Sequence, residues 1–111
     1  MEFGQLAAVV AVADAGSFTA AAEVLGHSQP AVSQAVRALE RELGVQLFER
    51  RSTGVLVTAA GEACLAPARQ ALHDREAARD AVRSVDGLEA GHLDIACIPS
   101  LAADIAAPIV G

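Results

Sequence analysis

Apolar residues recur at helical spacing in the segment from residue 28 to residue 44. Spacings of i, i+4, i+7 and i+11 place them on one side of an α-helix, and they are Val32, Val36, Leu39 and Leu43. Ser28 stands at an N-cap position, Pro30 falls in the first turn, and Gly44 follows the last apolar residue as a stop signal. The pattern predicts an amphipathic helix with well-marked ends.

The opposite side of this helix carries side chains that core packing does not use. They are Gln29, Pro30, Ser33, Gln34 and Arg37. Amides, a hydroxyl and a guanidinium on a free helix face suit entry into the DNA major groove. Two amphipathic helices in an ordinary bundle would show the same periodicity, so both interpretations stand at this point.

The segments before this helix predict two further helices. Ser17 can cap a helix whose inner side is Phe18, Ala21, Ala22 and Leu25. Gly26 ends that helix, and the turn over residues 26–28 gives helix-turn-helix spacing. An earlier helix over residues 2–13 would close a three-helix core with Phe3, Leu6, Val9, Val10 and Ala13 inward.

The segments after Gly44 predict a hairpin and a long helix. Apolar anchors at residues 45–48, a turn at residues 52–54 and a β-prone run at residues 55–57 indicate a short wing. Thr58 is placed as the N-cap of a helix from Ala59 to about Val85, in which Pro67 is expected to cause a bend. The fold class is therefore mainly α, a winged helix-turn-helix followed by a long linker helix.

The long helix carries an apolar stripe that needs a partner. Cys64, Ala71, Ala78 and Val85 lie seven residues apart. The simplest partner is the same helix of a second subunit, and packing back on the chain's own helices is the alternative. Residues 86–91 are interpreted as a linker, residues 93–98 as a strand, and Leu101 as near the start of another helix. The predicted domains are residues 1–58, residues 59–87, and a truncated domain start at 88–111.

Composition and charge limit the possible functions. The 111 residues have 3% aromatic content and a net charge of −6. Through residue 58, four arginines stand against six carboxylates, which gives about −2 for the proposed DNA-binding part. We therefore expect affinity to come from a dimer and from helix N-termini rather than from bulk charge.

Several other classes of protein are not indicated. No apolar run reaches the roughly 20 residues of a membrane span and no signal peptide opens the chain, so we expect a soluble, cytoplasmic protein. Cys64 and Cys97 show no metal-site spacing and are expected to be reduced, buried thiols. Three scattered histidines (His27, His73 and His92) indicate no catalytic arrangement, and no metal or cofactor is expected.

Five runs of residues resemble the N-terminal part of LysR-type transcriptional regulators. They are Phe18-Thr19-Ala20-Ala21-Ala22-Glu23-Val24-Leu25, Ser28-Gln29-Pro30-Ala31-Val32-Ser33-Gln34, Arg37-Ala38-Leu39-Glu40, Leu43-Gly44-Val45-Gln46-Leu47-Phe48-Glu49-Arg50 and Thr58-Ala59-Ala60-Gly61-Glu62. The resemblance implies a winged helix-turn-helix that binds interrupted inverted repeats of double-stranded DNA. It also implies a homodimer through the linker helix, often within a tetramer, and a small-molecule effector bound by a second domain.

The resemblance also implies roles for individual residues. Gln29, Pro30, Ser33 and Gln34 would meet base edges, Arg37 would reach phosphate or base, and Arg50 and Arg51 would approach the backbone or the minor groove from the wing. The implied DNA-contacting set is Ser17, Thr19, Ser28, Gln29, Pro30, Ser33, Gln34, Arg37, Arg50 and Arg51. Ser17 and Thr19 are equally well explained as helix caps, and Ser100 is a candidate effector contact that a plain N-cap role also explains.

Two positions depart from the pattern of the family. Position 34 is often basic there and is Gln34 here, which removes a charge that could clamp phosphate. Leu56 stands where a polar wing residue is expected, so that a hydrophobic spot on the wing is one outcome. The acidic net charge leaves a second functional hypothesis open, namely a dimerisation module without DNA binding of its own.

Overall fold

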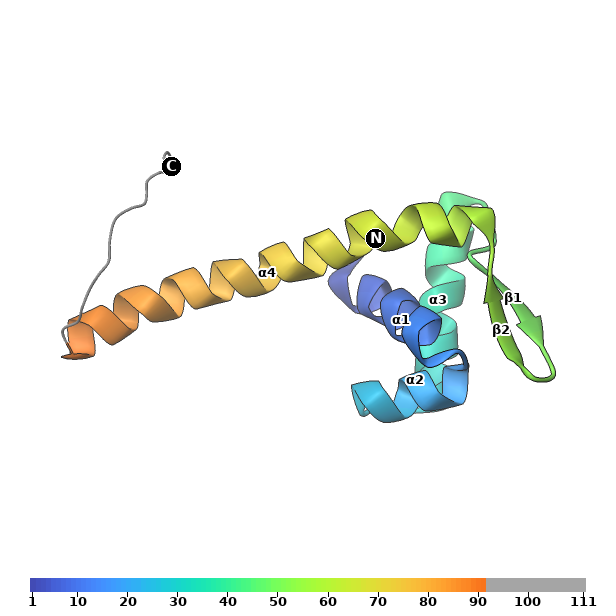
Figure 1. Ribbon diagram of the computed structural model, residues 1–111, viewed down its shortest axis with the longest axis horizontal. Coiled ribbons are helices and arrows are strands. Elements are labelled where there is room, and N and C mark those ends of the chain that lie inside the picture. Colours follow the sequence, from blue (N-terminus) through green and yellow to red (C-terminus); the bar gives the residue numbers. More distant parts are fainter. Residues whose placement is uncertain (92–111) are drawn as a thin grey trace. The chain divides into compact units, whose positions relative to one another are not determined.

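The computed structural model describes residues 1–91, and the predictions for Cys97, Ser100 and the strand and helix after residue 92 lie outside them. Figure 1 labels the elements, which are α1 (Phe3–Ala15), α2 (Phe18–Leu25), α3 (Gln29–Leu43), β1 (Phe48–Arg51), β2 (Gly54–Val57) and α4 (Ala59–Gly91). The chain divides into two compact units, Met1–Asp74 and Arg75–Gly111. No helix of the described residues is long and apolar enough to cross a membrane. The predicted winged helix-turn-helix is confirmed.

The first unit is built around a core formed by α1, α2 and α3. Its side chains are mainly small and aliphatic, and the fully buried ones include Val9, Val12, Val32, Val36 and Leu39. The helical spacing of Val32, Val36 and Leu39 therefore identified the core face of α3 correctly. The prediction that Phe3 and Leu43 face the core is wrong. They lie at the ends of their helices and are 46% and 41% exposed. The first helix also runs two residues beyond the predicted end at Ala13.

Hydroxyl groups fix the starts of three helices at the predicted positions. Ser17 Oγ accepts a hydrogen bond from Ala20 N at 3.1 Å, and Ser28 Oγ accepts one from Ala31 N at 3.2 Å. Thr58 Oγ1 accepts from Gly61 N at 3.0 Å. Each bond satisfies a backbone N–H that the helix itself leaves without a partner. The turn between α2 and α3 is closed by Gly26, whose left-handed φ of 70° suits glycine.

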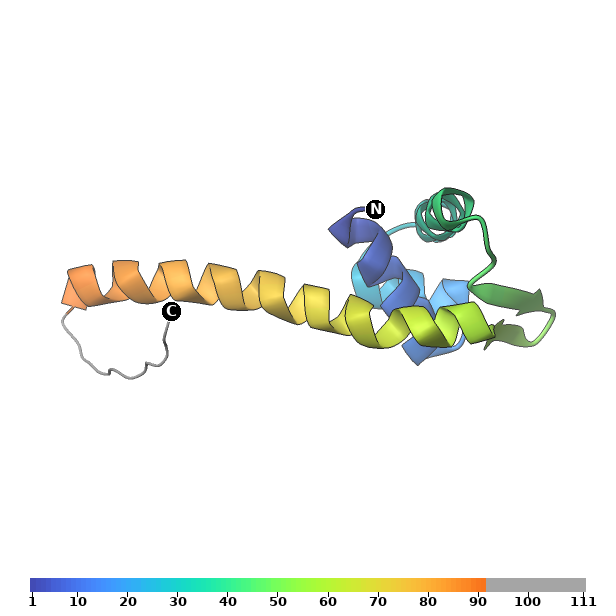
Figure 2. The same cartoon turned by 90° about the horizontal axis from the view of Figure 1, so that it is seen from above.

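The predicted hairpin is confirmed as β1 and β2, which pair antiparallel with Phe48 opposite Val57 and Arg51 opposite Gly54. Phe48 is buried in the core, and Val55 N donates a hydrogen bond to Gly16 O at 3.1 Å. These contacts attach the hairpin to the helices both at its open end and near its turn. From above, α3 is seen nearly end-on and the hairpin projects away from the helices (Figure 2).

Helix α4 packs its first half against the core of the first unit. Ala68 is 3% exposed, and Cys64, Leu65, Ala71 and Leu72 are half-buried against the same core. Of the two predicted partners of the long helix, the chain's own helices are therefore the correct one for the first half of α4. In the second unit, Val82 and Val85 are 64% and 55% exposed. The linker expected at residues 86–91 is wrong, since α4 continues to Gly91.

Candidate nucleic-acid interface

The first three turns of α3 leave a row of side chains open to solvent. Gln29, Pro30, Gln34 and Arg37 are exposed, as the sequence predicted. The N-terminus of the helix is capped by Ser28, and its first turn holds no acidic residue. A helix start with no carboxylate beside it favours negative ligands, because its N–H groups carry partial positive charge.

Ser33 departs from this row, and its predicted exposure is wrong. Only 8% of the residue is accessible, and its Oγ accepts a hydrogen bond from Arg50 Nη1 at 3.2 Å. The cause is a contact that helical spacing does not reveal, because Arg50 lies 17 residues further along the chain. Strand β1 brings the guanidinium of Arg50 over Ser33. Ser33 therefore contacts the wing and is not part of the free face of α3.

Arg50 joins three elements of the fold. Its guanidinium carbon lies 4.0 Å from the centroid of the Phe18 ring on α2, and that ring meets Phe48 edge-on at a centroid distance of 6.1 Å. Partial burial lowers the pKa of the Arg50 guanidinium from its ordinary value, and the positive charge of Arg37 lowers it further. Arg50 is consequently held in one place by stacking and by its bond to Ser33.

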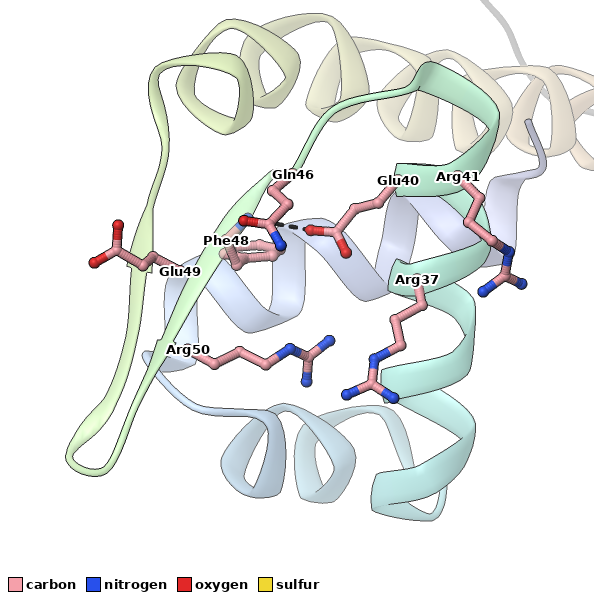
Figure 3. A pocket seen from close by; sticks show the side chains of 7 residues that line it. All are labelled: Arg37, Glu40, Arg41, Gln46, Phe48, Glu49 and Arg50. Carbon is pink, nitrogen blue, oxygen red and sulfur yellow. Dashed lines mark hydrogen bonds between the residues drawn. The ribbon is translucent and has the colours of Figure 1, made fainter.

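A hollow of about 590 Å³ separates α3 from the wing (Figure 3). It is lined by Arg37, Glu40, Arg41, Gln46, Phe48, Glu49 and Arg50. In the close view, the guanidinium groups of Arg37 and Arg50 point toward each other across it. The arrangement concentrates positive charge at one place on a chain whose net charge is −6.

Glu40 has a structural role that the sequence did not reveal. Its Oε2 accepts hydrogen bonds from Leu47 N at 2.8 Å and from Phe48 N at 3.3 Å, at the entrance to β1. The carboxylate thus fixes the segment that leads from α3 into the wing. A glutamate near the end of a helix is too common a feature to indicate this contact from the sequence.

A second hollow of about 470 Å³ lies between the start of α2 and the wing, and Ser17, Thr19 and Arg51 are among its lining residues. The Ser17 hydroxyl serves as a helix cap there, whereas Thr19 is exposed. Arg51 is also exposed and pairs with the carboxylate of Glu49 on the same strand. These predicted residues are therefore brought together beside the wing, with Arg51 neutralised by its neighbour.

Other chemistry is not indicated in the part of the chain that the structure describes. No group of three or more His, Cys, Asp or Glu side chains could hold a metal ion there. Cys64 is a half-buried free thiol. The described residues offer polar and cationic side chains on one helix and its wing, and this arrangement suits recognition of a polyanion.

Comparison with known proteins agrees with this arrangement. Residues 3–62 match the family described as "Bacterial regulatory helix-turn-helix protein, lysR family". The HTH-type transcriptional regulator ClcR of Pseudomonas putida is 46% identical over 96 residues, which are 86% of this chain and 33% of that protein. The probable HTH-type transcriptional regulator LrrA of Synechococcus elongatus is 41% identical over 108 residues, or 97% of this chain and 37% of that protein.

Solved structures give the same result. The crystal structure of a CbnR_DBD–DNA complex has a TM-score of 0.72 and 44% identity, and the match covers 78% of this chain and 99% of that one. The BenM_DBD/catB site 1 DNA complex has a TM-score of 0.70 and 36% identity, with 83% of this chain and 100% of that chain covered.

The fold and the sequence together define a winged helix-turn-helix protein. The chain belongs to the lysR family of bacterial regulatory helix-turn-helix proteins. It spans about a third of the length of ClcR and of LrrA.

Proposed function

We propose that this chain is the DNA-binding part of a LysR-type transcriptional regulator and that α3 reads base edges in the major groove. The observation that carries the proposal is the exposed row at the start of α3, formed by Gln29, Pro30 and Gln34. A glutamine amide can donate to and accept from adenine in a bidentate pair, and an apolar ring can pack against the methyl group of thymine. Two of the similar solved structures are DNA complexes, which supports DNA as the partner of this chain.

Phosphate contacts would orient this helix in the groove. The exposed side chains of Thr19 and Arg51 flank the hollow beside the wing, and the helix dipole places partial positive charge at the N-terminus of α3. The wing would approach the backbone or a narrow minor groove with Arg51, which exchanges its bond to Glu49 for one to phosphate. Because few cations are involved, the salt dependence of binding would be moderate.

The proposed assembly is a homodimer through α4, and two such dimers would form a tetramer in the full-length protein. Val82 and Val85 are exposed on the second half of this helix and are suited to burial against a second copy. Two copies related by a two-fold axis would present their α3 helices to an interrupted inverted repeat, with half-sites about 34 Å apart. The response to a small-molecule effector would reside in a further domain, for which Ser100 remains a candidate contact.

Selection of binding sites from random duplexes tests the function directly. We expect an inverted repeat to be recovered. Gln29→Ala should then relax the preference at one base pair by about 1–3 kcal/mol, whereas Arg51→Ala should weaken all duplexes more evenly. Recovery of no common sequence by a protein that sediments as a dimer would reject DNA reading and favour a dimerisation module.

A further inference from the structure

Arg37 and Arg50 form a pair of like charges, and Glu40 is a carboxylate whose charge acts on Arg50. Their guanidinium groups face each other across the hollow between α3 and the wing (Figure 3). Within residues 1–91, neither of them takes part in an ion pair. Holding two guanidinium groups so close costs electrostatic free energy, which a bound anion would offset.

The carboxylates that line the same hollow are already engaged. Glu40 accepts hydrogen bonds from two backbone amides at the entrance to β1, and Glu49 pairs with Arg51 on β1. Arg41, from the next turn of α3, adds a third positive charge to the lining. The balance of charge at this place is therefore positive, although the chain as a whole is acidic.

The Arg50 guanidinium is oriented before any ligand arrives. One of its N–H groups donates to Ser33 Oγ, and its central carbon lies over the Phe18 ring at 4.0 Å from the centroid. A guanidinium has five N–H donors, so the bond to Ser33 leaves others for an acceptor in the hollow. Little side-chain entropy remains to be lost on binding, which favours affinity.

We propose that Arg37 and Arg50 together bind one phosphodiester group of the DNA backbone, and that Ser33 positions the Arg50 guanidinium for this contact. The inference rests on the proposed function and deepens it. Phosphate oxygens accept charge-assisted hydrogen bonds from more than one guanidinium, and the bound phosphate would separate the two positive charges. One phosphate held jointly by α3 and the wing would set the angle at which α3 enters the groove.

Duplexes with a single neutral methylphosphonate per half-site test this proposal. At one position we expect wild-type affinity to fall about tenfold or more, as is typical for a lost charge-assisted hydrogen bond. Arg37→Gln and Arg50→Met should each reduce the loss at that same position to about threefold, because one guanidinium remains at the shared phosphate, and the double variant should be insensitive within about twofold. Methionine is chosen at position 50 because it keeps an apolar stem against the Phe18 ring. The control is Arg83→Gln, which changes an exposed arginine paired with Asp80 and should retain the tenfold loss.

Ser33→Ala separates positioning from base reading. We expect the methylphosphonate effect to shrink to about threefold while base preference stays unchanged, in contrast to Gln29→Ala. A change of base preference in Ser33→Ala equal to that of Gln29→Ala would overturn the positioning role. Loss of sensitivity at different positions in the Arg37 and Arg50 variants would show two separate contacts and overturn the shared site.

Inorganic phosphate distinguishes a DNA phosphate from a free anion. The duplex should shift the guanidinium NMR signals of both Arg37 and Arg50, whereas inorganic phosphate at the same phosphate concentration should shift neither. Equal shifts with both would assign the hollow to a free anion and overturn the proposal. A wild-type protein that binds selected and scrambled duplexes equally would instead refute sequence-specific recognition, so the two failures are distinguishable.

Discussion

Gly61→Ala and Gly4→Ala add the same methyl group to the first turn of two helices, and we expect opposite effects on stability. A Cβ at Gly4 would meet nothing within 4 Å. A Cβ at Gly61, in the first turn of α4, would overlap the Leu47 carbonyl oxygen and lie 2.7 Å from Val57 Cγ1. The close approach of α4 to the segment before the wing therefore requires glycine at position 61.

The magnitude follows from two opposing contributions. Alanine in place of glycine stabilises a helix by about 0.4–1 kcal/mol where the backbone tolerates it, and this is the whole effect expected at Gly4. At Gly61 the same gain is opposed by overlap with an oxygen that cannot easily move, because Leu47 O accepts a hydrogen bond from Thr58 N at 3.0 Å. Overpacking of this kind costs about 1–3 kcal/mol, so we expect a net loss of about 1–2 kcal/mol.

Urea unfolding followed by circular dichroism measures both variants. All samples need the same protein concentration, because any self-association would add to the apparent stability. With an m-value of about 1–3 kcal/mol/M, the midpoint of Gly61→Ala should lie clearly below that of the wild type and that of Gly4→Ala should lie at or above it. A Gly61→Ala protein as stable as Gly4→Ala would refute the packing argument.

Three further predictions concern carboxylates. In urea titrations, Glu40→Gln should lower the free energy of unfolding by about 1–2 kcal/mol, because a neutral amide replaces the carboxylate that accepts from the N–H groups of Leu47 and Phe48. The control Glu42→Gln, on the same helix, should change it by less than about 0.5 kcal/mol. The hydrogen bond from Arg69 lowers the pKa of Asp14, so its stabilisation is present above the ordinary carboxyl pKa and is lost as the pH falls through the folded-state value. Thermal unfolding from pH 7 to pH 2 should show a smaller loss in Asp14→Asn than in the wild type, and equal losses would contradict this assignment. Glu49→Gln should strengthen binding to all duplexes by roughly twofold to fivefold at low salt, since it frees Arg51 from its ion pair. A filter-binding assay that shows no gain in affinity at low salt would refute this.

Local signals in the sequence determined the helix boundaries of the first unit. Ser17, Ser28 and Thr58 cap helices because a hydroxyl can reach an N–H three residues ahead, a contact that depends on few residues and is visible in the sequence. The end of α4 was missed for a related reason. Residues 86–91 include two glycines, which predict a break, yet the helix continues through the first of them.

Contacts between distant residues were beyond such local signals. Ser33 lies on the polar side of α3 by its spacing, but the strand that carries Arg50 covers it. Phe3 follows the core periodicity of α1, yet it lies at the start of the helix, where part of the ring reaches solvent. The free row of Gln29, Pro30 and Gln34 was predictable because no other element of the described chain packs over it.

The acidic net charge becomes compatible with a DNA-binding role once individual carboxylates are followed. Glu40 accepts hydrogen bonds from backbone amides. Glu49 and Asp14 each pair with an arginine, and Glu42 pairs with the N-terminal ammonium. The first turns of α2 and α3 hold no acid. Within a Debye length of about 10 Å, a phosphate beside α3 would therefore experience mainly the local arginines and the helix N-terminus, and only weakly the rest of the acidic charge. Net charge is consequently a poor guide to the partner of this fold, because recognition depends on the charges that lie within one Debye length of the contact.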